Sequence, residues 1–454
     1  MSKHKKLIVS VAVTVILGVV LITFFGKNVF AQSKPQDNRT QIVFWHEMGG
    51  PAEKTLLKLV NNFNKSQNEY QVIPKYQGSY DTAIQKIFQT HGTNTSPAVF
   101  QSSNVSTAQV LHSEYTTPIQ KFVDQDHYDL SKISPVARAF HAQGGKQQAM
   151  PFNTSQPVLY YNASLLEKYG ITPPSVSPSY SEITKIAKEL YEKSHHKVKG
   201  MTVQIYGWLL EEAIANSGGM FANENDGHTG IPTKVNINTP ESVEFFKWIR
   251  ENIKDGDFMD YGSGSMASTN QTSGFLTNKV GMYIQSSASM SQLNKKNKNK
   301  LGITYFPHPD GKKANGVSIG GAALWISNDK PEAIQKGAYE FIKYTVRPEV
   351  QAEWQKSTGY MALNKDSQKT SILQKFYAKH PEGKIPGQQL NNTVPNYGNS
   401  GILLEGMQTI RKLEEDAMEK IYRGGDIEHI LKGNERTIND LVYSQNRANG
   451  LTEK

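Results

Sequence analysis

The chain has 454 residues, more than one hydrophobic core usually serves, so its length predicts two lobes. Lysine and arginine number 50 against 41 acidic residues, a formal charge of +9, and no basic stretch is interleaved with aromatic residues. This pattern argues against nucleic-acid binding. The sequence contains no cysteine, which excludes disulfides, thiolate metal sites and a cysteine nucleophile.

The N-terminus has the order of an export signal. A lysine-rich start precedes an apolar stretch of 19 residues from Leu7 to Phe25, and Val29-Phe30-Ala31 offers a small-residue cleavage site. That stretch is long for a signal and just long enough to span a bilayer. We therefore expect residues 1–31 to be a cleaved signal peptide or an uncleaved N-terminal anchor, followed by a disordered linker over 32–40. In either case we predict an exported, extracellular or cell-surface protein.

Strand and helix patterns alternate after this linker. Ile42–Trp45 predicts a buried strand, and apolar residues recur at helical spacing over 51–63. Tyr70–Tyr76 predicts the next strand, and Gly78–Asp81 opens another helix. This alternation is typical of an α/β lobe with a largely parallel sheet.

The stretch Pro151–Asn162 joins a polar segment to an apolar one. Asn153–Gln156 carries side chains able to bind a ligand, and Val158–Tyr161 has the composition of a strand. Pro157 removes one backbone donor where the character changes. We expect this stretch to cross between two lobes and to line the cleft between them, where small ligands are usually held.

The same patterns continue to the C-terminus. Helices are predicted from Tyr180 and from Trp208, and a short strand at 281–284 is followed by the polar cluster 286–289. Two further strands, at 303–306 and 318–326, are expected to lead back through the first lobe. The remaining expected elements are helices over 331–345 and 348–359 and a mostly helical end from 371, with a loop at 391–400.

No catalytic or metal-binding motif is complete. His46-Glu47 lacks the second histidine of a zinc-protease helix, and Gly262–Ser265 lacks the spacing of a nucleophile elbow. Asn223–Gly227 begins like a calcium loop but lacks the later oxygen ligands. We therefore predict no enzyme activity, no catalytic residue, no metal site and no cofactor.

Five segments in this order resemble the glycerol-3-phosphate-binding proteins of ABC importers, within extracellular solute-binding family 1. They are Phe44–Gly50, Tyr76–Tyr80, Pro151–Asn162, Ile319–Trp325 and Ser357–Tyr360. The resemblance spans nearly all of the chain after the export segment. It implies an α/β, two-lobed periplasmic-binding-protein-like fold with discontinuous lobes, a hinge of about three crossings and an interlobe cleft. The implied first lobe is 41–154 plus 304–327, and the implied second lobe is 155–303 plus 328–454.

The resemblance also implies a set of cleft residues. Six of them have a structural alternative: Tyr80 could be a helix-start aromatic packed on the sheet, Trp208 could lie in a core, Thr154 and Ser155 could form a turn bonded to its own backbone, and Gly320 and Gly321 could form a simple bend. The implied ligand-binding residues are Tyr80, Asn104, Thr154, Ser155, Trp208, Ser287, Gly320, Gly321, Tyr360 and Tyr397.

Two positions depart from the family's pattern and bear on the ligand. Asn104 aligns with a glutamate, and Leu403 aligns, without gaps, with an arginine that would suit phosphate. Glycerol-3-phosphate or a glycerophosphodiester is the leading ligand class, and a neutral oligosaccharide or polyol, stacked on aromatic side chains, is the alternative.

The predicted function is substrate capture for an ABC permease by a monomer that does not bind nucleic acid. A secreted hydrolase and a surface adhesin that has lost its cleft are the rival classes. A hydrolase would need paired carboxylates or a metal cluster in the cleft, and would turn its ligand over.

Overall fold

Strands and helices alternate in the computed structural model, which describes residues 38–296 and 298–451. The predicted export segment, residues 1–31, and most of the predicted linker lie outside the described residues. Within the described part, no helix is long and apolar enough to span a membrane. Residues 41–454 form one compact unit, which contains two main sheets.

The first sheet is mixed, where the sequence predicted a largely parallel one. Strands β1 and β3 are parallel, but β13 runs antiparallel to β3, with Ala322 opposite Ser103. β13 begins beside the last residue of β3, so the two neighbouring strands run in opposite directions. In sheet order the strands are β2 (Tyr70–Tyr76), β1 (Thr40–His46), β3 (Val99–Ser103), β13 (Ala322–Ser327) and β4 (Thr116–Thr117), and β7 (Met150–Pro151) also pairs with β13.

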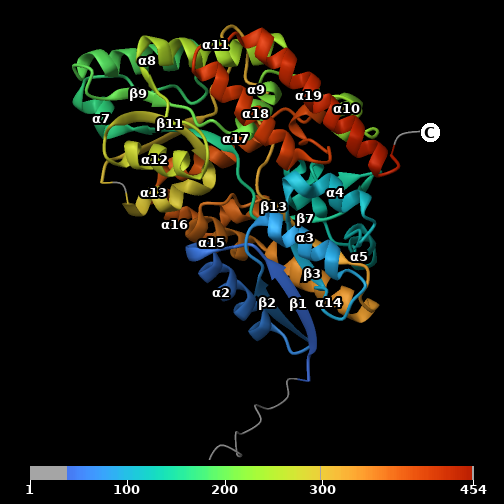
Figure 1. Cartoon of the computed structure of the whole chain (residues 1–454). Helices are drawn as coiled ribbons and strands as arrows, with labels where there is room; N and C mark the ends of the chain where they lie inside the picture. The colour runs from blue at the N-terminus through green and yellow to red at the C-terminus, as the bar shows by residue number, and fades with distance from the viewer. Residues whose placement is uncertain (1–37, 297, 452–454) are drawn as a thin grey trace, which may run out of the picture. The chain divides into compact units, whose positions relative to one another are not determined.

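Three helices pack with this first sheet in one hydrophobic cluster (Figure 1). Helix α2 (Gly50–Ser66) has Pro51 in its first turn and buries its apolar face, as its spacing predicted. Helices α14 (Glu332–Thr345) and α15 (Pro348–Thr358) contact α2, and α14 also contacts β13. This packing differs from the predicted division, which assigned everything after 327 to the second lobe.

The second sheet is also mixed. Strand β8 lies between β11 and β12 and is antiparallel to both. The predicted strand 303–306, which we expected to lead back through the first lobe, instead contributes to β12 in this second sheet. Its apolar pattern predicts a strand but does not show which sheet the strand joins. In order the strands are β10 (Phe258–Met259), β9 (Lys199–Thr202), β11 (Val280–Ser286), β8 (Pro157–Asn162) and β12 (Leu301–Tyr305).

The helices of the second sheet's core include one that is buried on every side. Helix α9 (Gly207–Asn216) buries all ten of its residues, and it packs against α11 (Pro240–Asp255) and α18 (Met407–Tyr422). The C-terminal helix α19 (Ile427–Ala448) covers α18 (Figure 1). Helix α8 (Tyr180–Lys193) packs on β9.

Shorter elements complete the described chain. They are α3 (Tyr80–Thr90), α4 (Thr107–His112), α5 (Gln120–Asp126), α6 (Pro135–Ala139), β5 (Ala142–Gln143), β6 (Lys146–Gln147), α7 (Ala163–Lys168), α10 (Asn223–Gly227), α12 (Ser265–Leu276), α13 (Met290–Lys296), α16 (Ser371–Lys379) and α17 (Ile385–Asn392).

The chain passes between the two sheets along paired segments. Ser155 and Gly320 exchange backbone hydrogen bonds of 3.0 and 2.8 Å, and the amide of Met361 donates to the carbonyl of Thr154 over 2.9 Å. These contacts tie three passages of chain together at one place. We propose that the first lobe contains 41–154, the strand from 322 and helices α14 and α15, and that β12 belongs to the second lobe.

Candidate functional site

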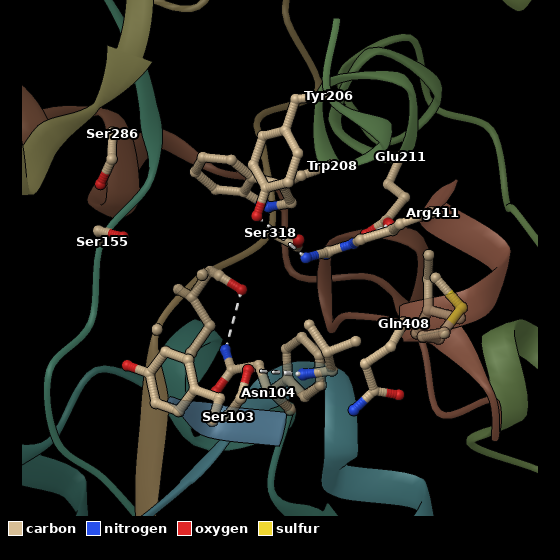
Figure 2. Close-up of a pocket in the computed structure, with 18 of the residues that line it drawn as sticks. Ser103, Asn104, Ser155, Tyr206, Trp208, Glu211, Ser286, Ser318, Gln408 and Arg411 are labelled. Atoms are coloured by element: carbon tan, nitrogen blue, oxygen red, sulfur yellow. Dashed lines mark hydrogen bonds and ion pairs between the residues drawn. The ribbon is translucent and has the colours of Figure 1, made fainter. Parts of the chain in front are cut away.

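A cavity of about 540 Å³ lies between the two sheets, beside these passages. Its lining comes from the ends of first-sheet strands, from the passages themselves, and from helices α9 and α18. Figure 2 shows Ser103 and Asn104 facing Tyr206, Trp208 and Arg411 across it.

Seven of the ten predicted ligand-binding residues line this cavity. They are Tyr80, Asn104, Ser155, Trp208, Gly320, Gly321 and Tyr360. The other three lie elsewhere. Thr154 and Ser287 are buried and Tyr397 is 45% exposed, stacked on His228. The cavity is lined by Ser286 in place of its neighbour Ser287, whose hydroxyl accepts from the amide of Gln156.

Tyr80 is held in place by a buried amide network. The side-chain amide of Asn153 donates to the Tyr80 hydroxyl over 3.0 Å, and Gln101 donates to Asn153 over 2.7 Å. Burial raises the pKa of Tyr80 well above its usual value. The phenol therefore keeps its proton and can donate it to a ligand.

Asn104 places a free acceptor in the cavity wall. Its side-chain nitrogen donates to the carbonyl of Ile319 over 3.0 Å, and its backbone amide donates to Gly321. Its Oδ1 is buried and has no hydrogen-bond partner among the described residues. An acceptor fixed in this way suits a ligand hydroxyl.

Aromatic side chains form the apolar part of the cavity. Trp208 packs over Gly320, where an added Cβ would lie 2.9 Å from the indole Cζ2, so only glycine allows this contact. Tyr206 stands at 60° to Trp208, with ring centroids 6.0 Å apart. Tyr360 stacks on Trp354 behind the wall. Such faces suit the apolar side of a sugar, a glycerol chain or a quaternary ammonium group.

The cavity contains an arginine that the sequence reasoning missed. Arg411 forms two hydrogen bonds to Glu211, of 2.6 and 2.7 Å, and its Nη1 lies 3.4 Å from the Tyr206 hydroxyl. Leu403, which ungapped alignment put at the arginine position, is buried in the core of the first sheet. Burial opposes the charge of Arg411, but its pairing with Glu211 outweighs this and raises the pKa of Arg411.

Further acidic groups lie around this ion pair. Asp81 and Glu415 line the cavity together with Lys412. Two carboxyls, Glu212 and Glu414, are fully buried. The charged lining is therefore three acids and two bases, and the arginine is already paired. No group of histidine, aspartate or glutamate side chains in the described residues could hold a metal ion.

Comparison with known proteins identifies the class. The family "Bacterial extracellular solute-binding protein" matches residues 58–384. The chain belongs to this family, which confirms the family resemblance expected from the sequence.

Individual relatives are similar over most of their length. The sn-glycerol-3-phosphate-binding periplasmic protein UgpB of Yersinia pseudotuberculosis serotype I (strain IP32953) is 28% identical over 392 residues, covering 85% of this chain and 88% of its own. UgpB of Escherichia coli O6:K15:H31 is 29% identical with the same coverage.

Solved structures share the fold. UgpB from Mycobacterium tuberculosis in complex with glycerophosphocholine superposes with a TM-score of 0.71 at 17% identity, covering 90% of this chain and 99% of its own. The cyclic α-maltosyl-1,6-maltose binding protein from Arthrobacter globiformis gives 0.72 at 16% identity, with coverages of 90% and 100%. The two-lobed α/β fold expected from the sequence is confirmed.

Proposed function

We propose that this chain is the substrate-binding subunit of an ABC importer and captures a glycerophosphodiester, or glycerol-3-phosphate, in the cavity between its lobes. The observation that carries the proposal is the position of two groups on opposite walls of that cavity: Asn104, whose Oδ1 has no hydrogen-bond partner among the described residues, and the Arg411 guanidinium. A glycerol hydroxyl suits the first group and a phosphate oxygen suits the second.

The charge of the cavity favours a phosphodiester over a phosphomonoester. Two of the nitrogens of Arg411 are bonded to Glu211, so an incoming phosphate meets a partly neutralised cation. A diester carries one negative charge and a monoester up to two, so the monoester is repelled more by Glu211, Asp81 and Glu415. A diester bearing a cationic head group would also suit these acids.

A neutral oligosaccharide or polyol is the second candidate. Trp208, Tyr206 and Tyr360 line the cavity with aromatic faces on which a sugar ring can stack. The similarity in fold to maltose-type binding proteins supports this alternative. A hydrolase is a weaker candidate, because both oxygens of Glu211 are bonded to Arg411, which leaves this carboxylate poorly suited to act as a base or a nucleophile.

The family and the relatives' names support export, and we propose delivery of the bound solute to a permease by a monomer. The predicted N-terminal segment would either be cleaved or tether the protein to the membrane. Ligand contacts on both lobes exist only when the cleft is closed, so binding would favour the closed form for the permease to recognise.

A thermal-shift comparison tests the ligand. Glycerophosphocholine, glycerol-3-phosphate, maltose and glycerol are added at equal concentration, and each solution is recovered and checked for intact ligand. A ligand present at 100 times its Kd stabilises the folded state by about 2.7 kcal/mol. We expect the largest shift with glycerophosphocholine, which is recovered unchanged. A shift with maltose alone would contradict the phosphate assignment, and ligand turnover would contradict the binding-protein assignment.

A further inference from the structure

A buried carboxyl beneath the cavity is hydrogen-bonded to one of the hydroxyls that line it. Glu212, on α9, is 0% exposed. Its Oε2 accepts from the backbone amide of Ser318 over 2.7 Å, and its Oε1 accepts from the Ser318 hydroxyl over 2.6 Å. Ser318 itself lines the cavity and is labelled beside Tyr206 and Trp208 in Figure 2. The side chain of Trp208, another cavity residue, also acts on Glu212 and opposes the rise that burial causes in the pKa of its carboxyl.

The protonation state of Glu212 sets what Ser318 can offer a ligand. An ionised carboxylate only accepts, so the Ser318 hydroxyl must donate to it and can then only accept from a ligand. A protonated carboxyl can donate from Oε1 to the Ser318 oxygen, which frees the hydroxyl hydrogen to point into the cavity. The bond from the Ser318 amide to Oε2 is kept in both states.

Both states are accessible near neutral pH. Burial raises the pKa of Glu212 to about 7, against the opposing effect of the hydrogen bonds from Ser318. The charge of Glu211 on the same helix adds to the rise. Of the helices packed against α9, α18 contributes Arg411, Glu414 and Glu415, and the buried face of α11 carries no charged group.

An anion in the cavity favours the protonated form of Glu212 over the ionised form. Its negative charge disfavours a second negative charge on Glu212, and its oxygens need donors such as a freed Ser318 hydroxyl. A neutral sugar brings no charge, and its hydroxyls fit Ser318 as donor or as acceptor. A phosphodiester and a neutral sugar are therefore expected to differ in the number of protons that the protein takes up when each one binds.

We infer that Glu212 is a specificity-determining residue of the cleft: its ionised form takes up one proton from solvent when a phosphodiester binds, and this converts Ser318 from an acceptor into a donor for a phosphate oxygen. This inference rests on the proposed function. It adds a residue that touches no ligand but acts through Ser318.

Calorimetry in two buffers counts the protons. Glycerophosphocholine is titrated into the protein at about pH 7 in HEPES and in Tris, whose ionisation enthalpies differ, because its phosphodiester does not itself titrate there. We expect an uptake of about half a proton, since Glu212 is then about half ionised before binding. The Kd is expected to rise by up to about tenfold per pH unit above that point. Maltose, if it binds, should give heats that do not depend on the buffer.

Two carboxylate variants locate the proton. In Glu212→Gln the amide can accept from the Ser318 amide and donate to its hydroxyl, as the protonated acid does, so we expect no proton uptake and a Kd independent of pH. Asp226→Asn is the matched control. Burial also raises the pKa of Asp226 to about 7, but that residue does not line the cavity, so uptake should stay as in the wild type.

Each outcome decides a separate point. Glycerophosphocholine binding without proton uptake, or uptake that Asp226→Asn abolishes, would overturn the inference and leave the proposed function standing. Absence of glycerophosphocholine binding would contradict the proposed function itself. If Glu212→Gln does not fold, the wild-type and Asp226→Asn titrations still decide, because an uptake retained in the control supports Glu212 and one lost there refutes it.

Discussion

The two walls of the cavity differ in charge. The wall from the first sheet offers mainly neutral groups, the Tyr80 hydroxyl and the Asn104 oxygen, with Asp81 as its one lining carboxylate among the described residues. The wall from α9 and α18 holds the Glu211–Arg411 pair with further carboxyls beside and beneath it. Neutral groups fixed by a hydrogen-bond network distinguish ligand hydroxyls by geometry. Charged groups in a buried setting instead set which ligand charge is tolerated. We therefore expect the first wall to select a ligand mainly by the geometry of its hydroxyls and the second wall to select it mainly by its charge.

The largest expected effect comes from the passage that joins the walls. At Gly321 φ is +111°, and a Cβ there would lie 2.0 Å from the carbonyl oxygen of Asn153. Gly321→Ala should therefore destabilise folding by about 3 kcal/mol or more, measured by urea denaturation. Gly311→Ala is the control, since it shares a positive φ of +70° but meets no atom within 4 Å. Equal losses in the two variants would show that only backbone strain matters.

Breaking the ion pair tests the charged wall. Arg411→Met leaves Glu211 buried without its partner, and we expect a loss of about 3 kcal/mol in unfolding free energy. Adding Glu211→Gln should recover most of it, because the unpaired charge is then gone. If the double variant is no more stable than the single one, packing by Arg411 and not its charge supports this wall.

The pH dependence of stability tests the buried acid Glu414. Burial, followed by the charge of Glu211, raises the pKa of Glu414 well above its usual value. The folded state then binds more protons than the unfolded state above about pH 4.5, so stability from this group falls as pH rises. Glu414→Gln should remove that fall, gaining at least about 1 kcal/mol on the wild type between pH 5 and pH 8. A parallel pH profile for both proteins would contradict this.

The smallest effect is expected from a contact between α4 and the segment that precedes α18. His112 Nδ1 lies 2.6 Å from Glu405 Oε1, and both side chains are partly exposed. His112→Ala should weaken ligand binding by about two- to fivefold, because a part-exposed pair contributes less than about 1 kcal/mol to closure. Lys193→Ala removes a pair with Glu189 inside one helix and should leave the Kd unchanged. Equal effects would show that closure does not use the His112 contact.

The lining residues of the first wall were largely predictable from sequence, whereas the charged residues of the second wall were not. Tyr80, Ser155 and Gly320 sit in short motifs whose local order fixes their place, so a resemblance in sequence located them. Glu211 and Glu212 lie on a helix that is buried all round, which leaves no polar stripe to mark them. Arg411 enters the cavity only because α18 packs against α9, which an ungapped alignment cannot show.

The packing of α14 against the first sheet could not be predicted for a related reason. The apolar spacing of α14 predicted a helix correctly, but the same spacing would suit either sheet. Its contacts with α2 and β13 depend on the chain returning to the first sheet through 322–327. Ser287 was predicted where Ser286 lines the cavity, since a one-residue change at a strand end reverses the face that a side chain takes.

Equilibrium binding to a cleft variant tests the central claim most directly. Glycerophosphocholine and maltose are titrated separately into the wild type and into Asn104→Ala/Trp208→Leu, which alters both walls, after circular dichroism has shown that the variant is folded. We predict one glycerophosphocholine per wild-type chain and at least about a 30-fold weaker Kd in the variant. Unchanged glycerophosphocholine binding in the variant, or tight wild-type binding of maltose alone, would contradict the account.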